Sequence, residues 1–243
     1  MNFQVTLAYD GTDFRGWQMQ SGARTVQGVL TEALVRIDGA PVTVHGAGRT
    51  DSGVHAEGQV ASFFLRRPRP GEELRRALNG NLPPDLRVLE AAPTSDDFHA
   101  RANARSKTYR YQLYTAQVMC PFLRRFFWHY PHPLDLERLA EDGEALLGRH
   151  DFSAFTVSDC DVRSRIRTLT GFRIESDGPQ VLLTFAGDGF LRQMVRTIVG
   201  TLVDSNRGRL RAGSIRDLLT SRQRSLAGTP APAKGLTMVK VEY

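Results

Sequence analysis

The sequence predicts an α+β fold of two halves, because strand-like and helix-like hydrophobic patterns alternate along it in an order that nearly repeats. With 243 residues, 41% of them apolar and 24% charged, the chain has the composition of an ordinary globular protein. No apolar run approaches the roughly 18 residues of a membrane-spanning helix, and the amino terminus has no signal-peptide pattern. We therefore expect no membrane partner.

The first half carries the patterns of strand, helix, strand, strand, helix and strand. Residues 3–9 alternate apolar and polar side chains as in a half-buried strand, and apolar residues recur at helical spacing after Thr25, a suitable N-cap. The expected elements are residues 3–9, 26–37, 41–47, 59–65, 71–78 and 86–91. This order is the split β-α-β arrangement of ferredoxin-like domains.

The second half nearly repeats this order. We expect strands at residues 107–115, 126–130 and 236–243, a hairpin of residues 167–175 and 180–186, and helices at residues 134–147, 190–203 and 214–219. The boundary is placed so that residues 1–98 form the amino-terminal half and residues 99–243 the carboxy-terminal half. Each half is large enough for its own core.

The charge of the chain favours a polyanionic partner. The net charge is +6 and the isoelectric point about 9.7. Nearly all basic residues are Arg, which suits phosphate binding and stacking on bases, although a genome rich in Arg codons would have the same effect. The two cysteines, Cys120 and Cys160, allow neither a disulfide framework nor a cysteine-rich zinc site, which favours a cytoplasmic location.

Residues 46–55, Gly-Ala-Gly-Arg-Thr-Asp-Ser-Gly-Val-His, form the densest group of chemically active side chains. They fall between two expected strands, and their glycines allow tight turns. Asp51 is a candidate nucleophile or base beside the cation of Arg49 and two hydroxyl groups. The alternative is a hairpin loop in which Asp51 only caps a turn and pairs with Arg49.

Residues 9–18 form a second cluster, which contains Asp10 and Asp13. Two carboxylates three positions apart allow a magnesium site, and with it a metal-dependent RNA nuclease. An ordinary Asp-Gly-Thr turn explains the same residues, and no further acidic or histidine cluster completes a metal site in the sequence. The turn is the favoured interpretation.

Two further patterns allow recognition of nucleic acid. Arg192 and Arg196 share one face of an expected helix, so they either line an anion site or extend to solvent. Tyr109 and Tyr111 alternate with basic residues along an expected strand, which suits stacking on an extruded base. Packing within the sheet is the commoner role of such aromatic residues.

Taken together, these residues make the chain resemble the TruA family of tRNA pseudouridine synthases nearly from end to end. The most specific shared motif is Gly-Arg-Thr-Asp-Ser-Gly-Val-His at residues 48–55. Weaker matches are residues 9–11, 16–18, 25–27, 58–60, 81–83, 97–101, 109–111, 194–200 and 235–236. Residues 203–208 depart from the family pattern where the helix of Arg196 ends.

The resemblance implies isomerisation of uridine to pseudouridine in the anticodon stem-loop of tRNA, at positions 38, 39 and 40 in tRNA numbering. It also implies a homodimer and a pseudouridine synthase fold, in which two ferredoxin-like halves form a central cleft. By resemblance, Asp51 is the catalytic aspartate and Arg196 the basic residue that pairs with it. Tyr109 stacks on the target base, Leu236 is an apolar contact in the uracil pocket, and Arg49 helps to displace the target nucleotide.

The implied reaction requires neither a cofactor nor a metal. The bond between N1 and C1′ breaks and the uracil rejoins through C5, so no electrons are exchanged and no group is added. The base must leave the helical stack, at a cost that aromatic stacking and an apolar pocket offset. We therefore expect a cofactor-free tRNA isomerase, with the metal-dependent nuclease and a non-catalytic RNA-binding module as alternatives.

Overall fold

The computed structural model describes residues 1–157, 162–210 and 214–243; Cys160 lies outside the described residues. Two compact units are present: unit 1 consists of Met1–Arg105 with Thr237–Tyr243, and unit 2 consists of Ser106–Leu236. Both units contain strands and helices, which confirms the α+β class. Within the described ranges, no helix has the length and apolar character that crossing a membrane would require.

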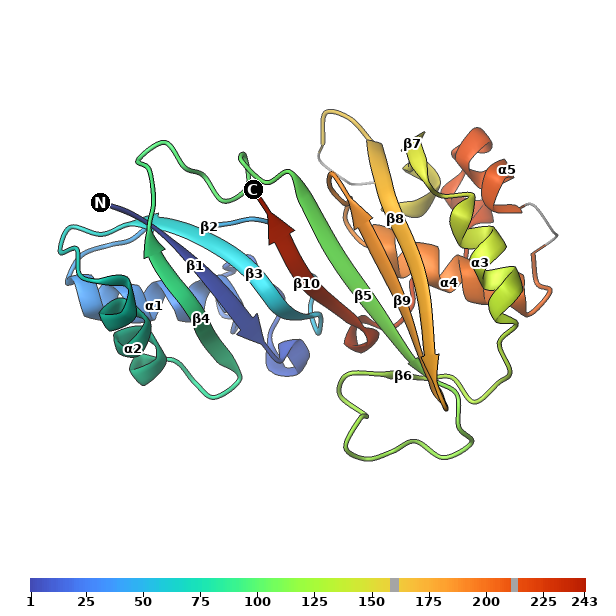
Figure 1. Cartoon of the computed structure of the whole chain (residues 1–243), viewed down its shortest axis with the longest axis horizontal. Helices are drawn as coiled ribbons and strands as arrows, with labels where there is room; N and C mark the ends of the chain where they lie inside the picture. Colours follow the sequence, from blue (N-terminus) through green and yellow to red (C-terminus); the bar gives the residue numbers. More distant parts are fainter. Residues whose placement is uncertain (158–161, 211–213) are drawn as a thin grey trace. The chain divides into compact units, whose positions relative to one another are not determined.

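The sheet of unit 1 is built around β1, with α1 and α2 on one of its faces (Figure 1). Its elements are β1 (Asn2–Tyr9), η1 (Gly11–Asp13), α1 (Val26–Asp38), β2 (His45–Gly46), β3 (His55–Phe64), α2 (Gly71–Asn81), β4 (Leu86–Pro93) and β10 (Leu236–Glu242), the last from Thr237 onward. β1 pairs antiparallel with β3 and β4, while β2 and β10 pair with opposite ends of β3, β2 antiparallel and β10 parallel. The element order of the first half is therefore the predicted one, with the carboxy-terminal strand added.

Capping and burial explain why α1 forms where it does. The Thr25 side chain accepts a hydrogen bond from the amide of Gly28 at 3.2 Å, which confirms it as the N-cap. Gly39, with a φ of 72°, ends the helix in the left-handed conformation that glycine adopts without strain. Val26 and Leu30 are completely buried on the inner face of the helix.

Unit 2 contains an antiparallel sheet in the order β5-β9-β8-β7. Its elements are β5 (Ser106–Tyr114), β6 (Trp128–His129), α3 (Leu136–Glu144), β7 (Gly148–Asp151), η2 (Ser153–Phe155), β8 (Ile166–Asp177), β9 (Gln180–Gly187), α4 (Met194–Asn206), α5 (Ser214–Ser221), η3 (Arg224–Leu226) and η4 (Ala233–Gly235). β8 and β9 form the predicted hairpin, whose turn contains Gly178 at a φ of 53°. The short β6 pairs parallel with the end of β5.

Some short strands differ from the prediction. The strand expected at residues 126–130 is only Trp128–His129, because the preceding residues form hydrogen-bonded turns, including a 3.0 Å bond from the Leu123 amide to the Cys120 carbonyl. The strand expected at residues 41–47 shrinks to His45–Gly46. β7 has no counterpart among the predicted strands, because its sequence, Gly-Arg-His-Asp, carries no alternating apolar pattern.

α4 extends beyond its predicted end at residue 203. The amide of Arg207 donates to the carbonyl of Val203 at 3.1 Å, and the amide of Gly208 donates to the carbonyl of Ser205 at 2.9 Å. Gly208 has a φ of 71°, the usual conformation of glycine just past a helix end. The segment that departs from the family pattern therefore ends the helix in a regular way.

Candidate active site

The loop that carries Asp51 joins β2 to β3 and is anchored on both sides. On the side of β2, the amide of Ala47 donates to the carbonyl of Val60 at 2.8 Å, and the Gln59 side-chain amide donates to the carbonyl of Gly48 at 2.8 Å. At the tip, the amide of Val54 donates to the carbonyl of Asp51 at 3.1 Å, closing a turn. The Asp51 side chain is half-buried on this fixed backbone.

Residues 9–18 pack directly against the Asp51 loop, so the two clusters of the sequence form one structure. The amide of Trp17 donates to the carbonyl of Thr50 at 3.0 Å, and the Ser52 hydroxyl donates to the carbonyl of Phe14 at 3.3 Å. The Trp17 ring is 2% exposed and lies against Gly46, where any Cβ would overlap the indole. The loop is thus held by a neighbouring segment as well as by its own turn.

Tyr9 connects the end of β1 to the residue that precedes Asp51. Its hydroxyl is hydrogen-bonded to the Thr50 hydroxyl at 2.8 Å, and its ring is 4% exposed. Burial raises the pKa of Tyr9 to about 12, although hydrogen bonds with the side chains of Thr50 and Gln59 oppose the increase. The phenol therefore stays neutral at physiological pH and acts as a fixed hydrogen-bonding partner.

Asp10 and Asp13 lie at the two ends of a short helical turn, η1. One Asp10 carboxylate oxygen accepts hydrogen bonds from the Thr12 amide at 3.0 Å and from the Thr12 hydroxyl at 2.6 Å, so Asp10 caps the short helix η1. Asp13 is exposed. Among the described residues, no group of three or more His, Cys, Asp or Glu side chains is placed to hold a metal ion. The structure supports the turn interpretation of this cluster.

In unit 2, the aromatic residues of β5 have different environments. Tyr109 is 6% exposed, and its ring packs edge-on against Phe190 with the centroids 4.9 Å apart. Tyr111 is completely buried, and its hydroxyl donates to the carbonyl of Pro232 at 2.8 Å. Burial raises the pKa of Tyr111 well above its ordinary value, while the positive charge of Arg196 opposes the increase. Tyr111 is therefore a core residue.

Arg196 lies in the first turn of α4 and is fixed by the segment that leads to β10. Its Nε donates to the carbonyl of Ala231 at 2.8 Å, and the amide of Ala231 donates back to the carbonyl of Arg196 at 2.9 Å. The close packing continues along the helix, where a Cβ on Gly200 would overlap the backbone of Thr229. Arg196 is half-buried whereas Arg192 is exposed, so the two arginines are not equivalent.

The predicted site residues are divided between the two units. Asp51 and the exposed Arg49 belong to unit 1, whereas Tyr109, Arg196 and Leu236 belong to unit 2. Leu236 is 6% exposed at the start of β10, directly after η4. Two supporting groups are additions from the structure: the Tyr9 hydroxyl and the main-chain carbonyl of Ala231. A main-chain carbonyl cannot be identified from a sequence. Tyr9, however, lies in residues 9–18, the second cluster that the sequence pattern indicates.

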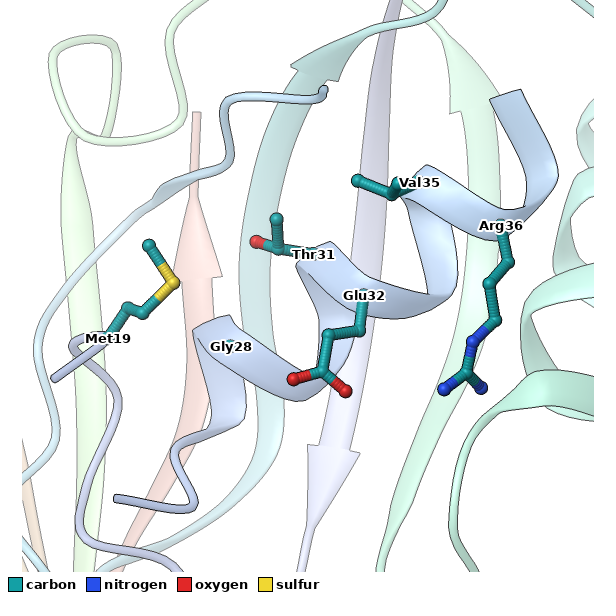
Figure 2. Close-up of a pocket in the computed structure, with 6 residues that line it drawn as sticks. All are labelled: Met19, Gly28, Thr31, Glu32, Val35 and Arg36. Atoms are coloured by element: carbon teal, nitrogen blue, oxygen red, sulfur yellow. The ribbon is translucent and has the colours of Figure 1, made fainter. Parts of the chain in front are cut away.

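A shallow hollow of about 330 Å³ lies on the outer side of α1 (Figure 2). Its lining residues are Met19, Gly28, Thr31, Glu32, Val35 and Arg36. None of the predicted catalytic or base-contacting residues lines it. The hollow is therefore separate from the candidate active site.

Comparisons with known proteins cover almost the whole chain. A family model described as tRNA pseudouridine synthase matches residues 6–102 and 144–243. The tRNA pseudouridine synthase A of Solibacter usitatus is 44% identical over 99% of this chain and 98% of its own length. The tRNA pseudouridine synthase A of Acetivibrio thermocellus is 43% identical over 100% of this chain and 99% of its own length. Both units are included in these matches.

Proposed function

The chain belongs to the tRNA pseudouridine synthase family, a family of isomerases, and we propose that it converts uridine to pseudouridine in the anticodon stem-loop of tRNA. The proposed targets are positions 38, 39 and 40 in tRNA numbering, and the proposed catalytic carboxylate is Asp51. The observation that carries this assignment is the anchored loop of residues 46–55. It presents a half-buried carboxylate on a backbone held by both Gln59 and Trp17.

Asp51 starts the reaction, either as a nucleophile or by removing a proton, and the bond between N1 and C1′ of the uridine breaks. The freed uracil turns and forms a bond from C5 to C1′. The proton on C5 leaves, and N1 takes up a proton, so the product is an isomer of the substrate. The reaction therefore needs no oxidant, no reductant and no group donor.

The other site residues have binding and positioning roles in the proposal. Tyr109 stacks on the target base, Leu236 contacts the uracil, and Arg49 helps to displace the nucleotide from its stack. Arg196 pairs with Asp51 and favours its ionised form. The support for Arg196 is its orientation, because the bond from Nε to Ala231 fixes the guanidinium at the start of α4.

The proposal also includes the arrangement of the whole protein. We propose that residues 1–98 and 99–243 are ferredoxin-like halves of a pseudouridine synthase fold with a central cleft, although residues 99–105 and the last strand, from Thr237, group with the first unit. We propose a homodimer that acts in the cytoplasm. Light scattering of the purified protein tests the dimer directly, and a monomeric mass at working concentrations would contradict it.

Release of tritium from tRNA that contains 5-tritiated uridine tests the chemistry, because formation of the bond between C5 and C1′ expels the C5 proton. Wild-type protein should release tritium in the presence of a chelator, whereas Asp51→Asn should release less than about one thousandth as much. Asp13→Asn, which changes an exposed carboxylate of the same unit, is the matched control and should react as wild type.

Two results would contradict the proposed reaction, and a third would contradict only the role of Asp51. Chelator-sensitive cleavage of the tRNA would indicate a metal-dependent nuclease. Intact, bound tRNA without tritium release from wild-type protein would indicate a non-catalytic RNA-binding module. Near-normal turnover by Asp51→Asn would remove Asp51 from its catalytic role while leaving the reaction established.

A further inference from the structure

The loop between β5 and β6 of unit 2 holds two large apolar side chains in solvent. Phe122 is 90% exposed and Val118 is 82% exposed, which makes them the most exposed large hydrophobic residues in the described part of the chain. Figure 1 shows this loop in light green beside the β6 label. A single exposed apolar residue needs no explanation, but two on one loop, one of them an aromatic ring almost fully in water, make the loop a candidate contact surface for a partner.

Hydrogen bonds fix the loop around Phe122. The amide of Leu123 donates to the carbonyl of Cys120 at 3.0 Å, and the amide of Phe126 donates to the carbonyl of Leu123 at 3.0 Å. The Gln112 side chain of β5 donates to the carbonyl of Phe126 at 2.9 Å, which ties the loop to the sheet. Because its turns are already formed, the loop loses little conformational entropy when it binds a partner.

The charge of the loop selects the chemistry of that partner. No Asp or Glu occurs between residues 106 and 134, whereas Arg124 and Arg125 directly follow Phe122 and Leu123. The Arg124 guanidinium donates to the carbonyl of Pro121 at 2.7 Å, which holds the cation against the turn that carries Phe122. A polyanion that also offers flat apolar rings complements this surface, and RNA has both properties.

A second copy of the chain fits the surface less well. If the loop lay on the twofold axis of a symmetric dimer, it would face its own copy, and Arg124 and Arg125 would approach the same two cations of the partner. The acid-free sequence around the loop offers no carboxylate to compensate. The observations therefore favour RNA as the occupant.

We propose that residues 118–125 form a further binding surface for the tRNA substrate, in which Phe122 stacks on an unpaired nucleobase and Arg124 contacts a backbone phosphate. The inference rests on the proposed function, because it takes tRNA as the ligand. It adds a contact to the roles given to Asp51, Tyr109 and Leu236. Phe122 and Arg124 act in binding, not in the chemical step.

A series of substitutions at Phe122 separates stacking from general hydrophobic contact. The Kd for tRNA, measured by filter binding at fixed salt, should rise about 10-fold in Phe122→Ala and nearly as much in Phe122→Leu, as expected for one lost base stack. Phe122→Trp should bind within about twofold of wild type, and tRNA should quench its added fluorescence. Leu89→Ala, which changes an exposed apolar residue beside Glu90 on β4, is the control and should bind as wild type.

A second variant tests the phosphate contact independently. Arg124→Ala should lower the slope of log Kobs against log salt concentration by about 0.7 to 0.9, the value for one neutralised phosphate. In both Phe122→Ala and Arg124→Ala, KM for tRNA should rise while kcat at saturating tRNA stays within about twofold of wild type. An unchanged Kd and salt slope in both variants would overturn the inference.

Other outcomes also overturn it. If Phe122→Leu binds tRNA as wild type while Phe122→Ala does not, the residue makes a hydrophobic contact and not a base stack. If Phe122→Ala changes the mass measured by light scattering, the loop is a subunit interface. Failure of the proposed function is a separate result, because wild-type protein would then release no tritium while the Kd series still tests the loop.

Discussion

Replacing Tyr9 with phenylalanine tests whether the buried hydrogen bond beside the Asp51 loop fixes that loop. The substitution keeps the ring in the core and removes only the hydroxyl, which bonds to the Thr50 hydroxyl at 2.8 Å and also to the Gln59 side chain. Loss of these buried hydrogen bonds, which leaves the Thr50 and Gln59 side chains with one partner fewer each, costs about 1 to 2 kcal/mol. For a chain of this size each kcal/mol lowers Tm by about 2 to 4 °C, so Tyr9→Phe should melt several degrees below wild type at pH 8.

At high pH the same substitution should stabilise the folded protein relative to wild type, because of the raised pKa of Tyr9. The pKa is raised from 10.0 to about 12, so the native state keeps a proton that the unfolded chain loses first. The stability that Tyr9 contributes is complete below pH 10 and is lost as the pH rises through 12. The loss is roughly 1.4 kcal/mol per pH unit, or roughly 3 kcal/mol in all. The phenylalanine ring of the variant has no such proton.

The two effects predict a crossing of the stability curves near pH 11. Urea unfolding of wild type and Tyr9→Phe, followed by tryptophan fluorescence between pH 8 and pH 12, measures it. Wild type should be the more stable protein at pH 8, and the variant should be the more stable one at pH 12. A constant difference across this range would refute the argument that Tyr9 is desolvated in the folded state.

Activity measurements complete this test. Because Thr50 directly precedes Asp51, loosening it should lower kcat for pseudouridine formation while the Kd for tRNA stays unchanged. Tyr114→Phe, which removes a hydroxyl from a half-exposed ring, is the control and should change stability at pH 8 by less than about 0.5 kcal/mol. An unchanged kcat in Tyr9→Phe would show that the loop keeps its position without this bond.

Gly46→Ala should destabilise the protein by about 1 to 3 kcal/mol and shift the Trp17 emission, because the new Cβ overlaps the indole ring. The matched variant Gly80→Ala, where α2 leaves nothing within 4 Å of a Cβ, should keep or slightly raise the midpoint of urea unfolding. Arg196→Lys keeps the charge but loses the Nε bond to Ala231, so tritium release should fall at least about 10-fold and Tm should decrease. Equal turnover by Arg196→Lys would mean that the charge alone is sufficient at this position.

Hydrophobic periodicity predicted the long elements of the fold and could not predict the short ones. β1 and α1 have regular apolar spacing because each buries one face, and the Thr25 cap of α1 is a local interaction. β7 is a strand only because its backbone pairs with β8, and its own side chains are polar. The sequence also predicts a strand at residues 236–243, but not that it pairs with the start of β3, far away in the chain.

In the candidate site, too, some features could be predicted from the sequence and others could not. The spacing of residues 46–55 identified the Asp51 loop, because glycines and reactive side chains are concentrated there. The groups that hold the loop are distributed over distant segments, and their identity depends on contacts that no spacing reveals. The position of Arg196 is equally hidden from the sequence, since one group that fixes it is the main-chain carbonyl of Ala231, which any residue type would supply. The fit of Trp17 against Gly46 is likewise invisible before the chain folds.

The glycines of the two amino-terminal motifs explain why these motifs occur together. A Cβ on Gly16 would lie 2.6 Å from the carbonyl of Thr50, and the φ of Gly16 is 82°, so only glycine fits at this crossing. A Cβ on Gly11 would overlap the backbone of Val54 on the other side of Asp51. The backbone of residues 9–18 is thus in close contact with the backbone of the loop on both sides of Asp51, at Thr50 and at Val54. A loop held this closely by a second segment can keep one side chain in position without a metal or a ligand. Substitution of Gly11 or Gly16 by alanine should therefore lower both kcat for pseudouridine formation and Tm.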